Sequence, residues 1–164
     1  MHRLKPGFFA VLLFAAFGAA VASARPVVVL KLEGDIVTRD SRGAEKLIAV
    51  ADGAGFQPGQ TVRYTIVASN KGADAALGLV PAARIPAGSA YDPGSASTSG
   101  ALRVEFSLDG GKTWSAKPLV KVQTANGTVE KPADPSLYTG LRWIGAKALE
   151  PKSNLTYSYQ VRIK

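Results

Sequence analysis

The sequence predicts an all-β protein: an antiparallel β-sandwich of about seven to nine short strands, preceded by a cleaved signal peptide. Three observations predict it. Apolar segments of period two recur along the chain, turn-forming residues separate them (17 Gly and 10 Pro in 164 residues), and no long stretch has a helical period. With 46% apolar and 20% charged residues, the composition fits one globular domain, expected over residues 25–164.

Residues 1–24 are expected to be a signal peptide. A basic start is followed by an uncharged apolar run from Phe8 to Ala22, and Ala22-Ser23-Ala24 has the small-x-small arrangement that signal peptidase needs. Cleavage after Ala24 predicts a bacterial protein that is periplasmic, on the cell surface or secreted, and that meets the membrane only through this transient segment. The alternative is an uncleaved anchor, although the run is shorter than the roughly 20 residues that span a bilayer.

The first half of the expected domain contains three short strands. Residues 25–37 are rich in β-branched side chains and predict a strand followed by a Gly34-Asp35 turn. A brief apolar strand is expected over Leu47–Ala51. Residues 61–70 alternate apolar and polar side chains, so one face of this strand is expected to be buried and the other hydrated.

The second half continues the same pattern. Residues 76–91 are expected to form a strand broken by Pro81, which a turn at Pro86-Ala87-Gly88 then reverses. The last segment, residues 154–164, alternates without a slip. Further strands are expected on both sides of Asp109-Gly110-Gly111, before an Asn126-Gly127 turn, and over residues 137–149 with Leu141, Trp143 and Ile144 as core residues.

Residues 106–114 contain the pattern Ser-x-Asp-x-Gly-x-Thr-Trp, which resembles the Asp-box hairpin of sialidase-type propellers. It occurs once, in a chain too short for a propeller, and is therefore expected to be structural. In this interpretation Ser107 and Asp109 hydrogen-bond the Gly110-Gly111 turn, and Trp114 packs down at the start of the return strand.

A longer pattern covers residues 56–97 and resembles the DUF11-type conserved repeat domain of bacterial envelope and surface proteins. The residues that carry this resemblance are Pro58, Gly59, Tyr64, Asn70, Gly72, Pro86, Gly88 and Tyr91. Pro58-Gly59 and Pro86 to Gly88 are expected to be turns, Asn70 and Gly72 to tolerate positive φ, and the two tyrosines to supply buried aromatic area. The resemblance implies an immunoglobulin-like, structural extracellular module with no established catalytic residues. The chain departs from the family at Ala83-Arg84, where an Asp is usual.

The residue types that are missing exclude much chemistry. The chain has no Cys, and its one His lies in the expected signal peptide, so nucleophilic triads and imidazole or thiolate metal sites are not expected, and neither is a cofactor. The acids Asp35, Asp40 and Glu45 alternate with bases and are expected to form a solvated charged turn. An enzyme with this composition would have to work through carboxylates or a Ser-Lys pair such as Lys152-Ser153. The chain is therefore expected not to be an enzyme.

The sequence therefore predicts an exported, non-catalytic structural or protein-interaction module of the bacterial cell envelope. Its partner is expected to be an envelope or surface protein, bound through a sheet edge. The alternative is a module for glycan or another polyanion such as anionic polysaccharide, because the net charge is +8, or +6 once Arg3 and Lys5 are removed. Nucleic acid is not an expected partner. The candidate ligand contacts are Trp114, Trp143, Tyr138 and Arg142, with a core position as the favoured interpretation of Trp143.

Overall fold

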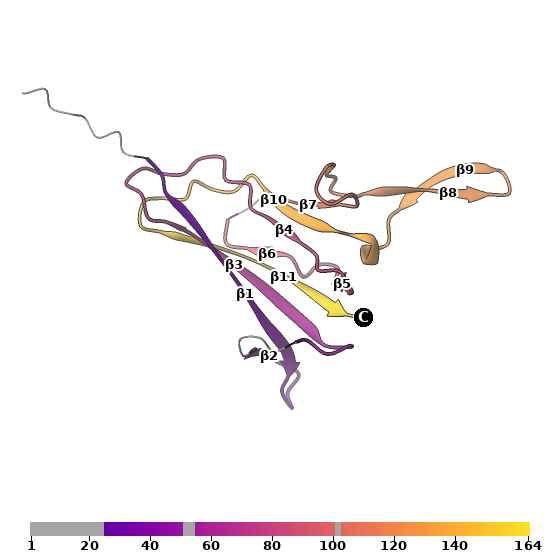
Figure 1. Cartoon of the computed structure of the whole chain (residues 1–164), viewed down its shortest axis with the longest axis horizontal. Coiled ribbons are helices and arrows are strands. Elements are labelled where there is room, and N and C mark those ends of the chain that lie inside the picture. The colour runs from indigo at the N-terminus through magenta and orange to yellow at the C-terminus, as the bar shows by residue number, and fades with distance from the viewer. Residues whose placement is uncertain (1–24, 51–54, 101–102) are drawn as a thin grey trace, which may run out of the picture.

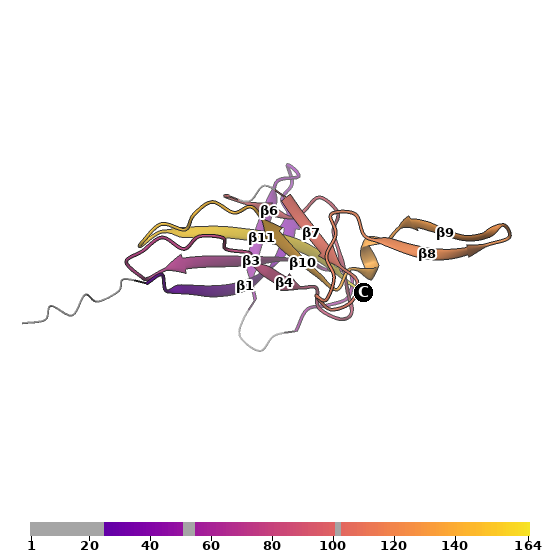
Figure 2. The ribbon, with the colours of Figure 1, turned by 90° about the horizontal axis from the view of Figure 1, so that it is seen from above.

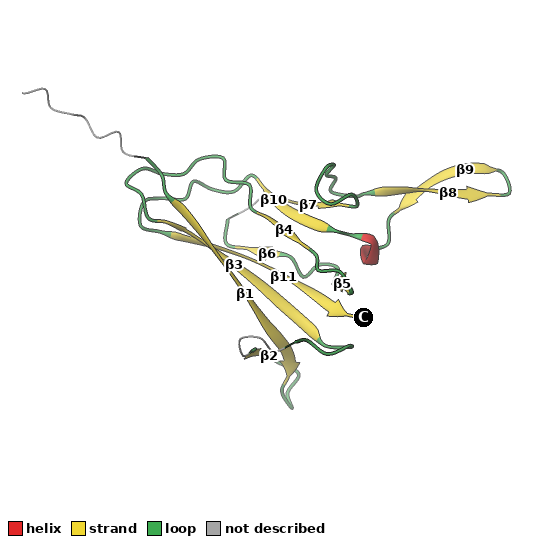
Figure 3. Ribbon diagram, in the orientation of Figure 1, coloured by secondary structure: helices red, strands yellow, loops and turns green. Residues whose placement is uncertain are grey.

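Two antiparallel sheets face each other in the computed structural model, which describes residues 25–50, 55–100 and 103–164 (Figure 1). The predicted class, an all-β antiparallel sandwich, is confirmed. The helical content of the described residues is one short 3-10 element, η1 (Pro135–Leu137) (Figure 3). No helix in these ranges is long and apolar enough to cross a membrane. The expected signal peptide, residues 1–24, lies outside the described residues.

The larger sheet is built on the two strands whose alternation is clearest in the sequence. Its central strand, β3, pairs along its length with β1 on one side and β11 on the other. The main path through the sheet is β2-β1-β3-β11-β5, and β6 also pairs with β11. The bounds are β1 (Val28–Arg39), β2 (Glu45–Ala49), β3 (Thr61–Asn70), β5 (Ser89–Tyr91), β6 (Ser97–Thr98) and β11 (Asn154–Ile163).

The smaller sheet has only three strands, in the order β4-β10-β7. A separate hairpin of β8 and β9 projects from the body of the molecule (Figure 1; Figure 2). The described strands number eleven, more than the sequence predicts, because pieces as short as β4 and β6 carry little pattern of their own. The bounds are β4 (Ala82–Arg84), β7 (Arg103–Ser107), β8 (Leu119–Thr124), β9 (Gly127–Pro132) and β10 (Gly140–Ile144).

The core lies between the two sheets and is filled by the faces that the alternation predicts. Tyr157 and Tyr159 of β11 pack against Trp143 of β10, with ring centroids 5.3 and 6.3 Å from that of the indole. Gln160, on the opposite face of β11, is also buried. The main buried apolar residues are Val62, Ile66, Ala68, Leu141, Trp143, Leu149, Tyr157, Tyr159 and Val161.

The predicted turn at Gly34-Asp35 is wrong, because β1 runs through both residues to Arg39. Gly34 lies opposite Tyr64 of β3, and a Cβ at this position would come within 3.2 Å of the Tyr64 ring. The glycine therefore makes room for an aromatic ring inside a strand and does not reverse the chain. The real turn lies beyond Arg39, where Gly43 has a φ of +79°.

Asn70 has a different role from the predicted one. Neither Asn70 nor Gly72 has a positive φ. Instead the Asn70 side chain is buried (1% exposed) and makes four hydrogen bonds. Its Oδ1 accepts from the backbone N–H groups of Val27 (3.2 Å) and Gly72 (2.9 Å), and its Nδ2 donates to the carbonyls of Asp74 (2.7 Å) and Leu149 (2.9 Å). Three chain segments, around Val27, residues 70–74 and Leu149, are thus joined at one amide, and all four of its hydrogen-bonding sites are used.

Gly72 is needed for close approach of backbones. A Cβ at this position would lie 2.3 Å from the Arg25 carbonyl oxygen and 2.6 Å from the Val27 nitrogen. No side chain fits there, so the residues that precede β1 can lie directly on the Gly72 backbone.

The Asp-box turn forms as predicted. Ser107 Oγ accepts from the backbone N–H of Gly111 (2.8 Å) and donates to Asp109 Oδ1 (2.8 Å). Asp109 in turn accepts from the Thr113 backbone N–H (2.9 Å) and hydroxyl (2.6 Å). Gly110 and Gly111 have φ angles of +74° and +94°, which glycine adopts without strain. The return side is shorter than expected, since beyond the turn it pairs through the isolated Phe106–Ser115 bridge.

The predicted turns at Pro58-Gly59, Pro86 to Gly88 and Asn126-Gly127 are also confirmed. Gly59, Gly88 and Gly127 have φ angles of +83°, +77° and +113°. The Pro86 turn is closed by the Ser89 backbone N–H, which donates to the Pro86 carbonyl at 3.2 Å. Tyr91 is buried as expected (5% exposed), whereas Tyr64 is half-buried and stacks on Tyr159.

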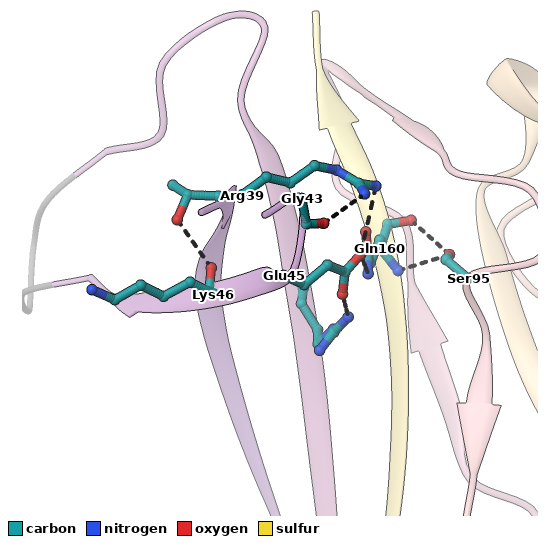
Figure 4. Close-up of polar contacts among 8 residues, drawn as sticks. Arg39, Gly43, Glu45, Lys46, Ser95 and Gln160 are labelled. Carbon is teal, nitrogen blue, oxygen red and sulfur yellow. Dashed lines mark hydrogen bonds and ion pairs between the residues drawn. The ribbon is translucent and has the colours of Figure 1, made fainter. Parts of the chain in front are cut away.

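The charged segment between β1 and β2 is only partly the solvated turn that the sequence predicts. Asp40 is exposed and accepts from backbone N–H groups of its own turn. Glu45, however, forms ion pairs with Arg63 of β3 and Arg39 of β1, and accepts from Gln160 of β11 (Figure 4). The bond from Gln160, followed by the pairing with Arg63, holds the pKa of Glu45 below its usual range. This cluster fastens β2 to the next strands of the sheet.

Candidate functional site

An apolar strip on β1 is left uncovered by the smaller sheet. Leu30 and Leu32 are 55% and 60% exposed, although both lie on the inner face of the larger sheet. Their register partners on β3 are Ala68 and Ile66, which are buried in the core. Because paired residues on adjacent strands point to the same face, β1 presents at Leu30 and Leu32 a core-facing side with no core above it.

The cover stops at β4, the edge strand of the smaller sheet. The Ile85 N–H donates to the Thr139 carbonyl (3.0 Å). The backbone N–H and C=O groups of the odd-numbered residues in and beside β4 therefore point toward β10. In antiparallel pairing the even-numbered residues then direct their backbone groups the other way. The backbone groups of Ala82 and Arg84 therefore point to the open side, above the uncovered strip.

One of these edge groups already has a partner. The hydroxyl of Tyr159 donates to the Arg84 carbonyl at 2.7 Å. Burial raises the pKa of this hydroxyl, which consequently stays protonated and able to donate. The N–H groups of Ala82 and Arg84 and the carbonyl of Ala82 remain on the exposed edge.

Strip and edge together form a groove of about 380 Å³. Both sheets contribute to its walls, and Arg84 is the charged residue among them. Such a groove offers an extended chain two things at once: backbone hydrogen-bonding groups along β4 and apolar contact with β1. The principal lining residues are Leu30, Leu32, Tyr64, Ala83, Arg84 and Tyr159.

The four residues predicted to contact a ligand do not converge on one surface. Trp143 is fully buried (0% exposed), so a ligand contact at this position is wrong and the core interpretation holds. The alternation of β10 explains this, because it directs Leu141 and Trp143 into the core together. Tyr138 belongs to an aromatic group with Phe106 (4.6 Å between centroids) and Tyr91 (6.0 Å).

Trp114 and Arg142 do lie together, on the outer face of the smaller sheet. The Arg142 guanidinium carbon is 4.9 Å from the Trp114 ring centroid, a cation–π arrangement. The same guanidinium donates twice to Glu105 Oε2, at 2.7 and 2.9 Å, and holds the pKa of Glu105 below its usual range. One face of the indole and the Arg142 charge are therefore already engaged. Beside them is a second hollow of about 340 Å³, lined by Trp114, Arg84 and the glycines 110, 111 and 140.

The proposed Ser-Lys pair has no catalytic geometry. Lys152 Nζ donates to the Lys71 carbonyl (2.6 Å), and Ser153 Oγ donates to the Glu150 carbonyl (2.7 Å). Each side chain is thus bound to a backbone acceptor and not to the other. Within residues 25–50, 55–100 and 103–164, no three acidic, His or Cys side chains are grouped as a metal site.

No protein-family model matches this chain, and neither a curated protein nor a solved structure matches it. The resemblance to the DUF11-type domain therefore stays a prediction from the residues that carry it. The groove between β1 and β4 is the feature from which a function can be argued.

Proposed function

We propose that this chain is an exported, non-catalytic protein-interaction module of the bacterial cell envelope, and that it accepts an extended segment of a partner protein along β4. The observation that carries the proposal is the exposure of Leu30 and Leu32 on the inner face of a sheet. Exposed apolar residues of this kind, beside a free strand edge, mark a surface that a partner covers. Export and envelope location are supported by the signal-peptide pattern of residues 1–24.

The mode of binding follows from strand geometry. A chain added to β4 would hydrogen-bond the exposed groups of Ala82 and Arg84, while its alternate side chains pointed down to Leu30 and Leu32. Backbone bonding of this type tolerates many sequences, so selectivity would come from the residues that face the apolar strip.

Site-specific photo-crosslinking in living cells tests the proposal. A photoreactive residue replaces Leu32 in one variant and Val29 in another. Val29 is 49% exposed and lies on the opposite face of the same strand, which makes it a matched control. We expect a discrete protein adduct from position 32 that position 29 does not give. Absence of any adduct at 32, or equal adducts at both positions, contradicts the proposal.

The alternative, a glycan or polyanion module, keeps one observation in its favour, the hollow that Trp114 and Arg84 line together. Aromatic and cationic groups are suited to stacking on sugars and pairing with acidic substituents. Salt-sensitive retention on envelope polysaccharide that is lost on Trp114→Ala, but kept on Leu32→Ser, would favour this function over the first.

A further inference from the structure

We infer that the occupant of the groove is the β8–β9 hairpin of a second copy of this chain. The inference rests on the proposed function, because it names the partner that the groove between β1 and β4 accepts. We call this hairpin, residues 119–132, the arm.

The arm has no support from its own chain. Every residue of β8 and β9 is exposed apart from Val120, which is half-buried. The arm leaves the body beyond Pro118 and Ala133, whose backbone bond (2.9 Å) closes its base, and it projects away from both sheets (Figure 2). Isolated two-stranded hairpins are marginally stable in water. An arm of this length therefore implies a surface that supports it.

One face of the arm carries three valines beside Lys131, and the other face is mostly polar. Val122 and Val129 are register partners and lie on the same face as Val120. The opposite face carries Lys121, Gln123, Thr128 and Glu130, with Leu119 and Pro132 at the base of the arm. A hairpin that was hydrated on both faces would have no use for this alternation. The three valines match the apolar strip, and the polar face would remain in water after docking.

The number of strands also matches. The main path of the larger sheet has five strands and the smaller sheet has three. The smaller sheet does not extend over β1 and β2, the two strands at one side of the larger sheet. Ile48 of β2 is a further exposed apolar residue (46%) on the inner face. An arm added to β4 supplies two strands, which brings the smaller sheet to five and places the valines over Leu30, Leu32 and Ile48.

The arm cannot serve the groove of its own chain, because it points away from β1 and β4 (Figure 1). Contact must then be between copies. Two copies that exchange arms form a closed dimer. If each copy instead gives its arm to the next copy only, a linear polymer forms. In either case the interface is the valine face of one arm on the Leu30–Leu32 strip of the next copy.

The absence of cysteine in the sequence allows a direct test with the protein purified after export. One tagged batch carries Val122→Cys and a differently tagged batch carries Leu32→Cys, and the two are mixed under oxidising conditions. A disulfide needs Cα atoms within about 7 Å. We expect a mixed disulfide dimer from this pair. The control pairs replace Val122→Cys by Lys121→Cys, or Leu32→Cys by Val29→Cys, and both controls lie on opposite faces.

Light scattering provides the second measurement. The wild-type protein is expected to have at least twice the monomer mass, and replacement of residues 119–132 by Asn-Gly should reduce it to the monomer mass. Monomeric wild-type protein, or a Val122–Leu32 disulfide no stronger than the controls, overturns the inference. If the photo-crosslinker at position 32 then still captures a different protein, only the identity of the occupant is wrong. If it captures nothing, the proposed function has failed as well.

Discussion

The hydroxyl of Tyr159 donates to the backbone carbonyl of Arg84 across the gap between the two sheets, at 2.7 Å. This bond joins β11 of the larger sheet to β4, the edge strand of the smaller one, at the margin of the groove. It ties β4 to β11 directly beside the uncovered part of β1.

Tyr159→Phe is expected to lower the free energy of unfolding by about 1 kcal/mol, because it removes this bond and keeps the ring in place. Tyr157→Phe is the matched control. The Tyr157 hydroxyl is buried and has no hydrogen-bond partner among the described residues, so its removal should be neutral or stabilising by up to about 1 kcal/mol. Chemical denaturation of both variants checks the pair. The same loss in both would mean that the Arg84 bond contributes nothing.

The sequence predicts the fold class and the buried faces well, because alternation in β3 and β11 depends only on local pattern. It also predicts the Asp-box turn, whose bonds join residues within a few positions of Ser107. The groove could not be predicted in this way. Leu30 and Leu32 alternate with Lys31 and Glu33, which indicates one dry face, and only the width of the opposing sheet decides whether that face is covered.

Long-range contacts explain the errors as well. Gly34 is a residue type that is common in turns, but here it lies inside a strand against the ring of Tyr64, which is distant in sequence. The sequence predicts a local, positive-φ role for Asn70, whereas two of its four side-chain bonds reach Val27 and Leu149, 43 and 79 positions away. In both cases the residue type signals a special position, and the tertiary neighbours determine which kind it is.

Asn70→Ala should lower the free energy of unfolding by roughly 3 kcal/mol, because buried backbone groups that lose their partner cost about 1–3 kcal/mol each. Equilibrium urea unfolding measures the loss. Asn154→Ala is the control, since Asn154 is exposed at the start of β11, and it should stay within about 0.5 kcal/mol of wild type. A small effect of Asn70→Ala would show that water replaces the amide at this junction.

Stability is expected to fall in acid. Bonds from Thr113 first, and then from Ser107, hold the pKa of Asp109 well below its usual range, and the pKa values of Glu45, Glu105 and Asp134 are also lowered. A carboxyl whose pKa is lower in the folded state stabilises the fold above its unfolded pKa, near pH 4, and loses that contribution as the pH falls through the folded value. The free energy of unfolding should therefore decrease steadily below about pH 4.

Asp109→Asn provides the control for this pH dependence. The variant should be less stable at neutral pH, since an amide cannot accept on both sides as the carboxylate does. It should also show a shallower decrease in acid, because the group with the largest lowering no longer titrates. Urea midpoints measured across the acid range decide the matter. An unchanged acid slope would assign the dependence to the other carboxyls.

Truncation of Leu141 should lower stability, whereas truncation of Leu32 should abolish oligomerisation and leave stability nearly unchanged. The pair therefore separates a functional surface from the core. Leu141 is 0% exposed, and Leu141→Ala should cost about 2–5 kcal/mol of stability. Leu32 is 60% exposed, so Leu32→Ser should change stability by about 0.5 kcal/mol or less and yet abolish the oligomer seen by light scattering. Thermal unfolding and mass are measured on the same samples. A loss of stability for Leu32→Ser as large as that for Leu141→Ala would make the strip a structural part of the sandwich.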